Sequence, residues 1–135
     1  MSSPQDAIAR IQYHARSLDG MREAPDYVPE SANQFPFAIS YYRTGNTIFE
    51  AGWLKGLHTI YSEIHVARQI LPSAIRAAMP FYDSLLAALE GDPRLNNTVD
   101  TIISPVVHSF GRLEFGGQET IGWRFEITVK IQTQG

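Results

Sequence analysis

Residues 121–131 read Ile-Gly-Trp-Arg-Phe-Glu-Ile-Thr-Val-Lys-Ile, and this stretch decides the fold. Large apolar side chains occupy every odd position, and polar or small residues occupy every even position. Successive side chains of a β-strand point to opposite faces, so this alternation predicts a long strand with one buried and one solvated face. Each of its six apolar side chains would contribute about 1.5–3 kcal/mol on burial, which makes the strand the expected centre of the core.

Two further strands are expected around it. Residues 106–115 are separated from the long strand by Gly116-Gly117, a pair typical of a tight turn, which predicts an antiparallel hairpin. Residues 57–67 are rich in β-branched side chains and predict another strand.

The region before residue 57 is expected to be more broken. Residues 37–42 predict a strand that closes at Arg43-Thr44-Gly45-Asn46, followed by a short strand or arm over residues 47–50. Residues 51–56 are bracketed by glycines and are expected to form a loop. Residues 21–36 contain three prolines and predict an extended connecting arm.

The first helix has a clear start signal. Ser3-Pro4-Gln5-Asp6 provides an N-cap, a proline in the first turn and an acidic residue three positions after the cap. We expect this helix to end at Asp19-Gly20 and to lie over one face of the sheet, with an apolar side that comprises Ile8, Ile11, Ala15 and Leu18.

A second helical stretch opens at Pro72. Its expected buried face comprises Ile75, Met79, Tyr82, Leu86 and Leu89, with Leu85 beside them. Pro80 either kinks this helix or starts a new one, and we favour a new helix because residues 79–89 alone carry a full amphipathic face. Gly91 is placed for a left-handed cap at the end.

Together these elements predict an α+β fold. It comprises a mostly antiparallel β-sheet with a long C-terminal hairpin, helices packed on the sheet, and an extended loop available for assembly. A chain of 135 residues can bury roughly two-thirds of its unfolded surface, so residues 1–135 are expected to form a single domain.

Composition excludes several functional classes. The chain has no cysteine, which rules out disulfides, thiolate metal ligands and a cysteine nucleophile. Its formal net charge of −3 lacks the basic field of a nucleic-acid-binding protein. No secretory signal starts the sequence, and no run approaches the roughly 20 apolar residues of a membrane span. We therefore expect a protein of the reducing cytoplasm, or one assembled there into something larger, with no membrane partner.

The search for catalytic and metal-binding residues finds no constellation. The four histidines show no ligand spacing, and His58 and His65 should point to opposite faces of one strand. The carboxylates are scattered, no serine lies in a Gly-x-Ser-x-Gly elbow, and the glycines of residues 111–117 do not form a phosphate loop. We expect no catalytic residue, no metal site and no cofactor, and hence not an enzyme.

Aromatic and apolar residues at positions that should be exposed indicate an assembly surface instead. The candidates are Tyr41, Tyr42, Phe49, Trp53, Leu54 and Lys55. Phe49, Trp53 and Leu54 fall in an excursion between Gly45 and Gly56, and the adjacent tyrosines cannot both face the same side of a strand. Arginine outnumbers lysine nine to two, and arginine and aromatic residues are enriched at interfaces. The alternative is that the loop folds back and buries Trp53 within its own chain.

A series of short segments extends through the chain from Pro25 onward. The segments are Gln34–Phe37, Gly56–Ile60, Glu63–Arg68, Leu71-Pro72, Ala78–Phe81, Gly91–Pro93, Thr98–Ile102, Phe115–Gly117 and Ile121–Lys130. In this order and spacing the chain resembles the tail terminator (tail completion, minor tail protein U-like) proteins of long-tailed bacteriophages and gene transfer agents.

The resemblance implies a structural role on a mixed α/β fold with an antiparallel sheet. Such proteins are expected to form a homo-hexameric ring that caps the tail tube, stops its polymerisation and connects the tail to the head-neck complex. The implied partners are the tail tube protein and a head-neck connector or stopper protein. DNA would pass through the lumen without specific binding, with which the acidic net charge is compatible. The implied location is the tail-neck junction of the virion, after assembly in the host cytoplasm.

Two alternatives stay open from the sequence. One is another neck or tail component, such as a head completion protein or the tube protein itself. The other is a small ligand-binding or hydrolytic α+β domain with a pocket between helix and sheet.

Overall fold

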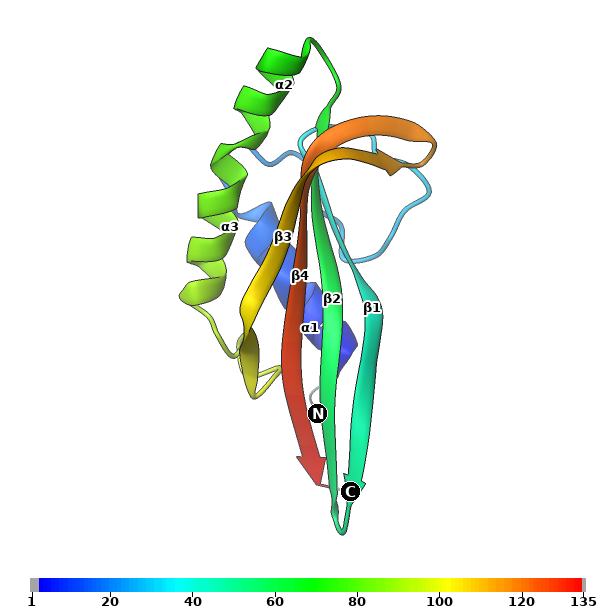
Figure 1. Ribbon diagram of the computed structural model, residues 1–135, viewed down its shortest axis with the longest axis vertical. Coiled ribbons are helices and arrows are strands. Elements are labelled where there is room, and N and C mark those ends of the chain that lie inside the picture. The colour runs from blue at the N-terminus through cyan, green and yellow to red at the C-terminus, as the bar shows by residue number, and fades with distance from the viewer. Residues whose placement is uncertain (1–2, 135) are drawn as a thin grey trace.

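Figure 1 shows the computed structural model, which describes residues 3–134; Met1, Ser2 and Gly135 lie outside the described part. The elements along the chain are α1 (Pro4–Arg16), β1 (Phe37–Glu50), β2 (Trp53–Ala67), α2 (Leu71–Ala78), α3 (Pro80–Glu90), β3 (Thr101–Phe115) and β4 (Gln118–Gln134). The strands form one antiparallel sheet in the order β1-β2-β4-β3, with helices packed against it. The predicted α+β class is confirmed.

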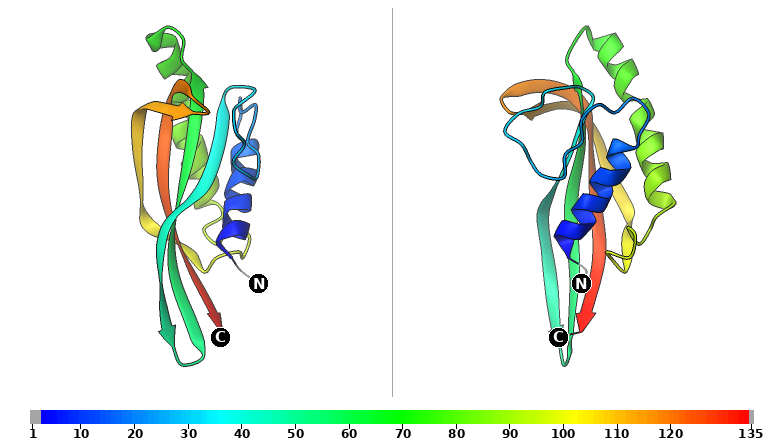
Figure 2. Two further views of the ribbon diagram at one scale, coloured as in Figure 1. Left: turned by 90° about the vertical axis from the view of Figure 1, so that its right-hand side faces the viewer. Right: turned by 180° about the vertical axis from the view of Figure 1, so that it is seen from behind.

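The alternating stretch of residues 121–131 forms most of β4, in the middle of the sheet. Its odd-numbered side chains are buried, as predicted, from Ile121 to Ile131. β4 pairs with β2 on one side and β3 on the other, so that Ile127 lies opposite Ile60. The helices cover the face that carries these odd-numbered side chains, as the edge-on view in Figure 2 shows. We call the other face of the sheet the open face.

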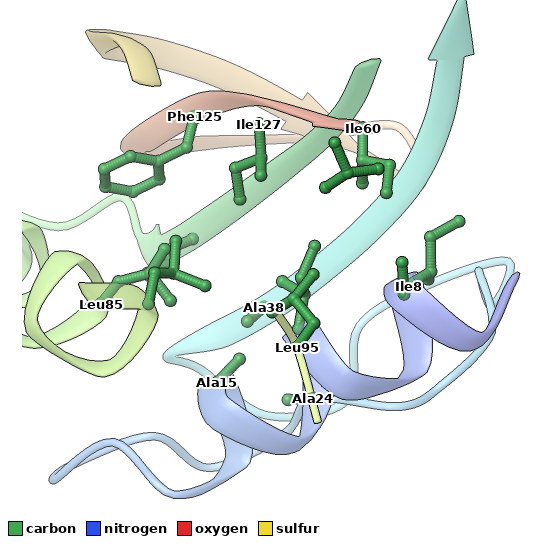
Figure 3. Close-up of a cluster of buried hydrophobic side chains, with 14 of the residues drawn as sticks. Ile8, Ala15, Ala24, Ala38, Ile60, Leu85, Leu95, Phe125 and Ile127 are labelled. Atoms are coloured by element: carbon green, nitrogen blue, oxygen red, sulfur yellow. The ribbon is translucent and has the colours of Figure 1, made fainter. Parts of the chain in front are cut away.

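The main core lies between this covered face and the helices. Figure 3 shows Phe125 and Ile127 pointing from the sheet toward Leu85 of α3, with Ala15 of α1 on the far side of the cluster. α1 begins where predicted, because the Ser3 side chain accepts a hydrogen bond from the Asp6 backbone N–H at 3.2 Å. The predicted apolar side of α1 is buried, although the helix ends at Arg16 rather than at Asp19-Gly20.

A charged cluster ties α1 to the end of α3. Asp92 Oδ2 accepts a hydrogen bond from Arg10 Nε at 2.8 Å and lies 2.7 Å from His14 Nε2, while Oδ1 accepts from the Asn96 backbone N–H at 2.8 Å. Burial by itself raises the pKa of Asp92, but these hydrogen bonds more than offset it and lower the pKa to about 2. The carboxylate therefore stays ionised and fixes the loop after α3 against α1.

Pro80 starts a new helix, as favoured from the sequence. The predicted buried face is confirmed on α3, where Leu85 and Leu89 are buried and Tyr82 and Leu86 pack against the core, but it is wrong on α2. The residues of α2 and α3 that are buried are Ala74, Ala78, Phe81, Leu85 and Leu89. Ile75 and Met79, which were expected in the core, are exposed. The two alanines seat α2 closely on the sheet, where the Trp123 indole N–H donates to the Ala78 carbonyl at 3.0 Å.

The expected left-handed cap at Gly91 is also wrong. Gly91 has φ −75°, and the left-handed residues are Leu95, Asn96 and Asn97 in the following loop. The Asp92 carboxylate accepts the Asn96 N–H, so the chain turns through this side-chain contact and not through the glycine.

The broken structure expected between residues 43 and 56 is one continuous hairpin. β1 does not close at Arg43–Asn46 but runs to Glu50, and the turn is limited to Ala51-Gly52. Gly45 lies within this strand. A glycine is needed there because a β-carbon would strike the Tyr42 hydroxyl. Trp53–Gly56, expected as a loop, forms the start of β2.

The predicted β3–β4 hairpin forms around Gly116-Gly117, whose φ values are +60° and +79°. Figure 1 shows its end bending away from the plane of the main sheet. At the bend Gly111 pairs with Gly122, and Gly122 lies against the Ile64 carbonyl oxygen with no room for a β-carbon.

The bent end covers part of the open face. Phe115 packs on Phe37 and His65 with ring centroids 4.9 and 5.8 Å apart. Both Phe37 and His65 are fully buried, although the main core lies on the other side of the sheet. The hairpin end thus closes a second, smaller core.

Candidate assembly surface

The β1–β2 hairpin extends beyond the helices at one end of the molecule (Figure 1, bottom). Every residue of β1 from Tyr42 to Glu50 is exposed. The ladder with β2 continues to the last pair, Glu50 with Trp53, and β4 supports β2 to the same point, where Gln134 pairs with Trp53. The projecting segment is therefore a hydrogen-bonded strand pair and not a loose loop.

Apolar side chains stand on both faces of this projection. Its members, which we call the hairpin tip, are Ile48, Phe49, Glu50, Trp53, Leu54, Lys55 and Leu57. Phe49, 81% exposed, pairs with Leu54 on one face. Ile48 and Trp53, the latter 42% exposed, lie on the opposite face with Leu57. Exposed apolar groups on both faces make this segment a candidate for contact with another protein.

The hairpin tip is electrically neutral. Its two charged residues pair with each other, with Lys55 Nζ 3.1 Å from Glu50 Oε2. A neutral apolar tip suits a protein partner, since nucleic acid binding needs uncompensated positive charge.

Four of the six candidate residues meet at this tip, and two do not. Phe49, Trp53, Leu54 and Lys55 lie together, and Trp53 is not folded back into its own chain. Tyr41 and Tyr42 lie further along β1, on opposite faces as expected from their adjacency. The Tyr42 hydroxyl lies 2.9 Å from His58 Nδ1.

Tyr41 belongs to a partly buried polar network on the open face, centred on the buried Glu63. The Glu63 carboxylate accepts hydrogen bonds from the Tyr41 hydroxyl at 2.7 Å and from Arg124 Nε at 2.9 Å. Its other oxygen lies 2.9 Å from His65 Nε2, and His65 Nδ1 lies 2.6 Å from the Thr120 hydroxyl. The network connects β1, β2 and β4.

The network keeps Glu63 ionised. Burial by itself raises the pKa of Glu63, but the hydrogen bonds from His65, Tyr41 and Arg124 outweigh it and lower the pKa to about 2. Burial and the bond to this carboxylate raise the pKa of Tyr41 to about 12. Tyr41 is therefore a donor to Glu63 at every ordinary pH.

Within this network a hydroxyl, an imidazole and a carboxylate lie in sequence, from Thr120 through His65 to Glu63. The sequence did not predict this arrangement. The spacing of Glu63 and His65 places both on one face of β2, but nothing in the sequence places Thr120 beside them. Nucleophile, base and orienting acid occur in this order in hydrolytic triads. Here Thr120 and His65 are fully buried, so no substrate reaches the hydroxyl in this conformation. The network is positioned to hold the sheet together.

Metal binding has no support in the described part of the chain. Among residues 3–134 no group of three histidine, aspartate or glutamate side chains is arranged to hold an ion. His58 and His65 lie on opposite faces of β2, as predicted. None of the helices in these residues has the length and apolar character to span a bilayer.

Comparison with family models and with curated proteins gives no family assignment. No protein-family model matches the chain, and no curated protein matches it significantly.

Proposed function

We propose that this protein is a structural virion subunit of the tail terminator type. Copies of it form a ring that caps the tail tube, ends tube polymerisation and connects the tail to the head-neck complex. The observation that carries the proposal is the projecting hairpin tip, with apolar side chains exposed on both faces. The protein acts through its surfaces and not as an enzyme.

Assembly explains the exposure of the tip. Leaving Phe49 and Trp53 in water costs free energy that burial against another subunit recovers, at about 25 cal/mol per Å² of apolar surface. Aromatic anchors on a stiff support are typical of the residues that dominate binding energy at interfaces. Ladders from β1 and β4 on both sides of β2 supply that stiffness.

The charge of the chain is compatible with passage of DNA. Each subunit carries −3, so a homo-hexamer multiplies an acidic charge that repels phosphate. In this proposal DNA moves through the lumen without being held, while the tail tube protein and a head-neck connector or stopper protein bind the two ends of the ring.

Two alternative functions differ from this one in what they require of the molecule. Another neck or tail component, including the tube protein itself, would use the same tip, but a tube subunit must stack on both ring faces without limit. A hydrolytic domain would need an accessible nucleophile, and the hydroxyl in the hydrolase-like order, Thr120, is fully buried.

Tube assembly in vitro tests the proposal. We expect addition of the purified protein to growing tubes of the tail tube protein to arrest elongation, with a closed six-fold ring at the capped end in negative-stain images. Light scattering of the protein alone should be recorded over a range of concentrations, since a ring that forms only on the tube end leaves the free protein monomeric. A monomer at every concentration that also leaves tube growth unchanged would contradict the proposal. Open-ended filaments of this protein alone would favour the tube subunit instead.

A further inference from the structure

A second exposed apolar surface lies on α2, at the opposite end of the molecule from the hairpin tip (Figures 1 and 2). Its members, which we call the α2 ridge, are Ile70, Leu71, Ile75 and Met79. Residues 71, 75 and 79 are spaced by four and form one stripe along the helix, and Ile70, 77% exposed, stands at its start.

α2 is inverted relative to an ordinary surface helix. Such a helix turns its large apolar side chains to the core and polar ones to solvent. Here Ala74 and Ala78 face the sheet, while Ile75 and Met79 face outward. Because the small residues seat the helix, Ile75 and Met79 each keep 39% of their surface exposed and available to a partner.

The chemistry of the α2 ridge complements that of the hairpin tip. The only charge in α2 is Arg76, which is exposed and has no ion-pair partner within residues 3–134. The tip offers Phe49 and Trp53 beside an ion pair that is already satisfied. An arginine at the edge of an apolar stripe can lie over an aromatic face while the stripe packs on the remaining apolar groups.

We infer that the α2 ridge of one copy receives the hairpin tip of the next copy. The inference rests on the proposed function and names the surface that meets the tip within the ring. The two surfaces lie at opposite ends of one chain, so a chain cannot bring them together itself (Figure 1). Contact between two different surfaces is heterologous, and repeated heterologous contacts generate a ring when the rotation closes.

Cysteine cross-linking tests the contact, because the natural chain has no cysteine. In the variant Phe49→Cys/Ile75→Cys, a short bismaleimide should link copies in series and give a ladder of covalent oligomers on a denaturing gel. Each single-cysteine variant should give dimers at most. The matched control Tyr27→Cys/Ile75→Cys replaces the tip position by Tyr27, which is 70% exposed and lies on neither surface. A ladder no stronger than that of the control, both free and bound to tubes, would overturn the inference.

A second experiment separates this inference from the proposed function. Ile75→Glu lies at an exposed position, so its melting temperature should match that of the wild type while ring formation is lost. Mixing Ile75→Glu with Phe49→Glu should give dimers, since the intact tip of the first variant can still meet the intact ridge of the second. If Ile75→Glu formed rings like those of the wild type, the inferred ridge contact would be ruled out, but the terminator proposal would stand. A covalent ladder without any effect on tube growth would support the contact and contradict the terminator proposal.

Discussion

Gly122 in β4 lies directly against the backbone carbonyl oxygen of Ile64 in β2, with no space for a β-carbon between them. Gly122 is the residue opposite Gly111 where the β3–β4 hairpin bends over the open face. The Ile64 backbone cannot move aside as a flexible side chain can. This contact therefore requires glycine at position 122, where the hairpin bends.

Gly122→Ala should destabilise the fold by roughly 1–3 kcal/mol or more through overpacking against β2. Urea unfolding at neutral pH measures the change. Gly111→Ala is the matched control, because nothing lies within 4 Å of a β-carbon at that position. Equal losses in the two variants would show that the contact with Ile64 does not set the cost.

Glu63 should make the protein sensitive to acid. Its pKa is about 2 in the fold against an ordinary value of 4.5, so its stabilisation is present above pH 4.5 and is lost as the pH falls toward 2. We expect Glu63→Gln to cost roughly 2–4 kcal/mol at pH 7 and the difference from wild type to shrink toward pH 2. Unfolding free energies measured across this pH range check it.

The control for that experiment is Glu114→Gln, at an exposed carboxylate on β3. Its stability should run parallel to that of the wild type at every pH. A difference between wild type and Glu63→Gln that stays constant from pH 7 to pH 2 would contradict the assigned role of the Glu63 carboxylate.

Asp92→Asn should release α1 from the loop after α3. The ionised carboxylate bonds Arg10 and lies against His14, and its loss should cost about 1–2 kcal/mol in thermal or urea unfolding. Asp26→Asn is the comparison, since Asp26 forms a surface pair with Arg16 that should contribute about 0–1 kcal/mol. Similar effects of the two substitutions would mean that the Asp92 cluster is worth no more than an exposed ion pair.

Trp53→Ala should separate assembly from folding. The side chain is 42% exposed at the tip and outside the core, so we expect a stability change within about 0.5 kcal/mol. Capping of tubes should nevertheless weaken at least tenfold, as for an interface anchor worth more than about 1.4 kcal/mol. Tyr27→Ala, at another exposed aromatic, should leave capping unchanged. A large loss of melting temperature in Trp53→Ala would assign the indole to the fold instead.

The sequence predicted the sheet best where one rule acted alone. In residues 121–131 alternation and burial agree, and the strand appears as expected. The helices were harder, because Ala74 and Ala78 seat α2 closely while the more apolar Ile75 and Met79 remain outside. Hydrophobicity alone selects the wrong stripe when close approach decides which side faces the sheet.

The candidate site was predicted in part. Apolar residues between glycines predict an exposed surface. The four candidates from this region do meet at the tip: Phe49, Trp53, Leu54 and Lys55. Local sequence rules interpret the glycines as loop signals, whereas Gly45 gives room to the Tyr42 side chain within a strand. The sequence also predicts Tyr41 on this surface, but its hydroxyl donates to Glu63 on the neighbouring strand, and local spacing does not reveal such a pairing.

The two central strands of the sheet come from different hairpins. The β1–β2 pair and the β3–β4 pair each close across a two-residue turn. The pairing of β2 with β4 instead joins Ala67 to Thr120, which are separated along the chain by α2, α3, the following loop and β3. Closing so long an interval costs more chain entropy than closing a tight turn. Each hairpin can therefore form early, and refolding should wait for the two halves to meet. During synthesis β4 leaves the ribosome after the other three strands of this sheet, so until then β2 has an unpaired edge and the nascent chain is open to misassociation.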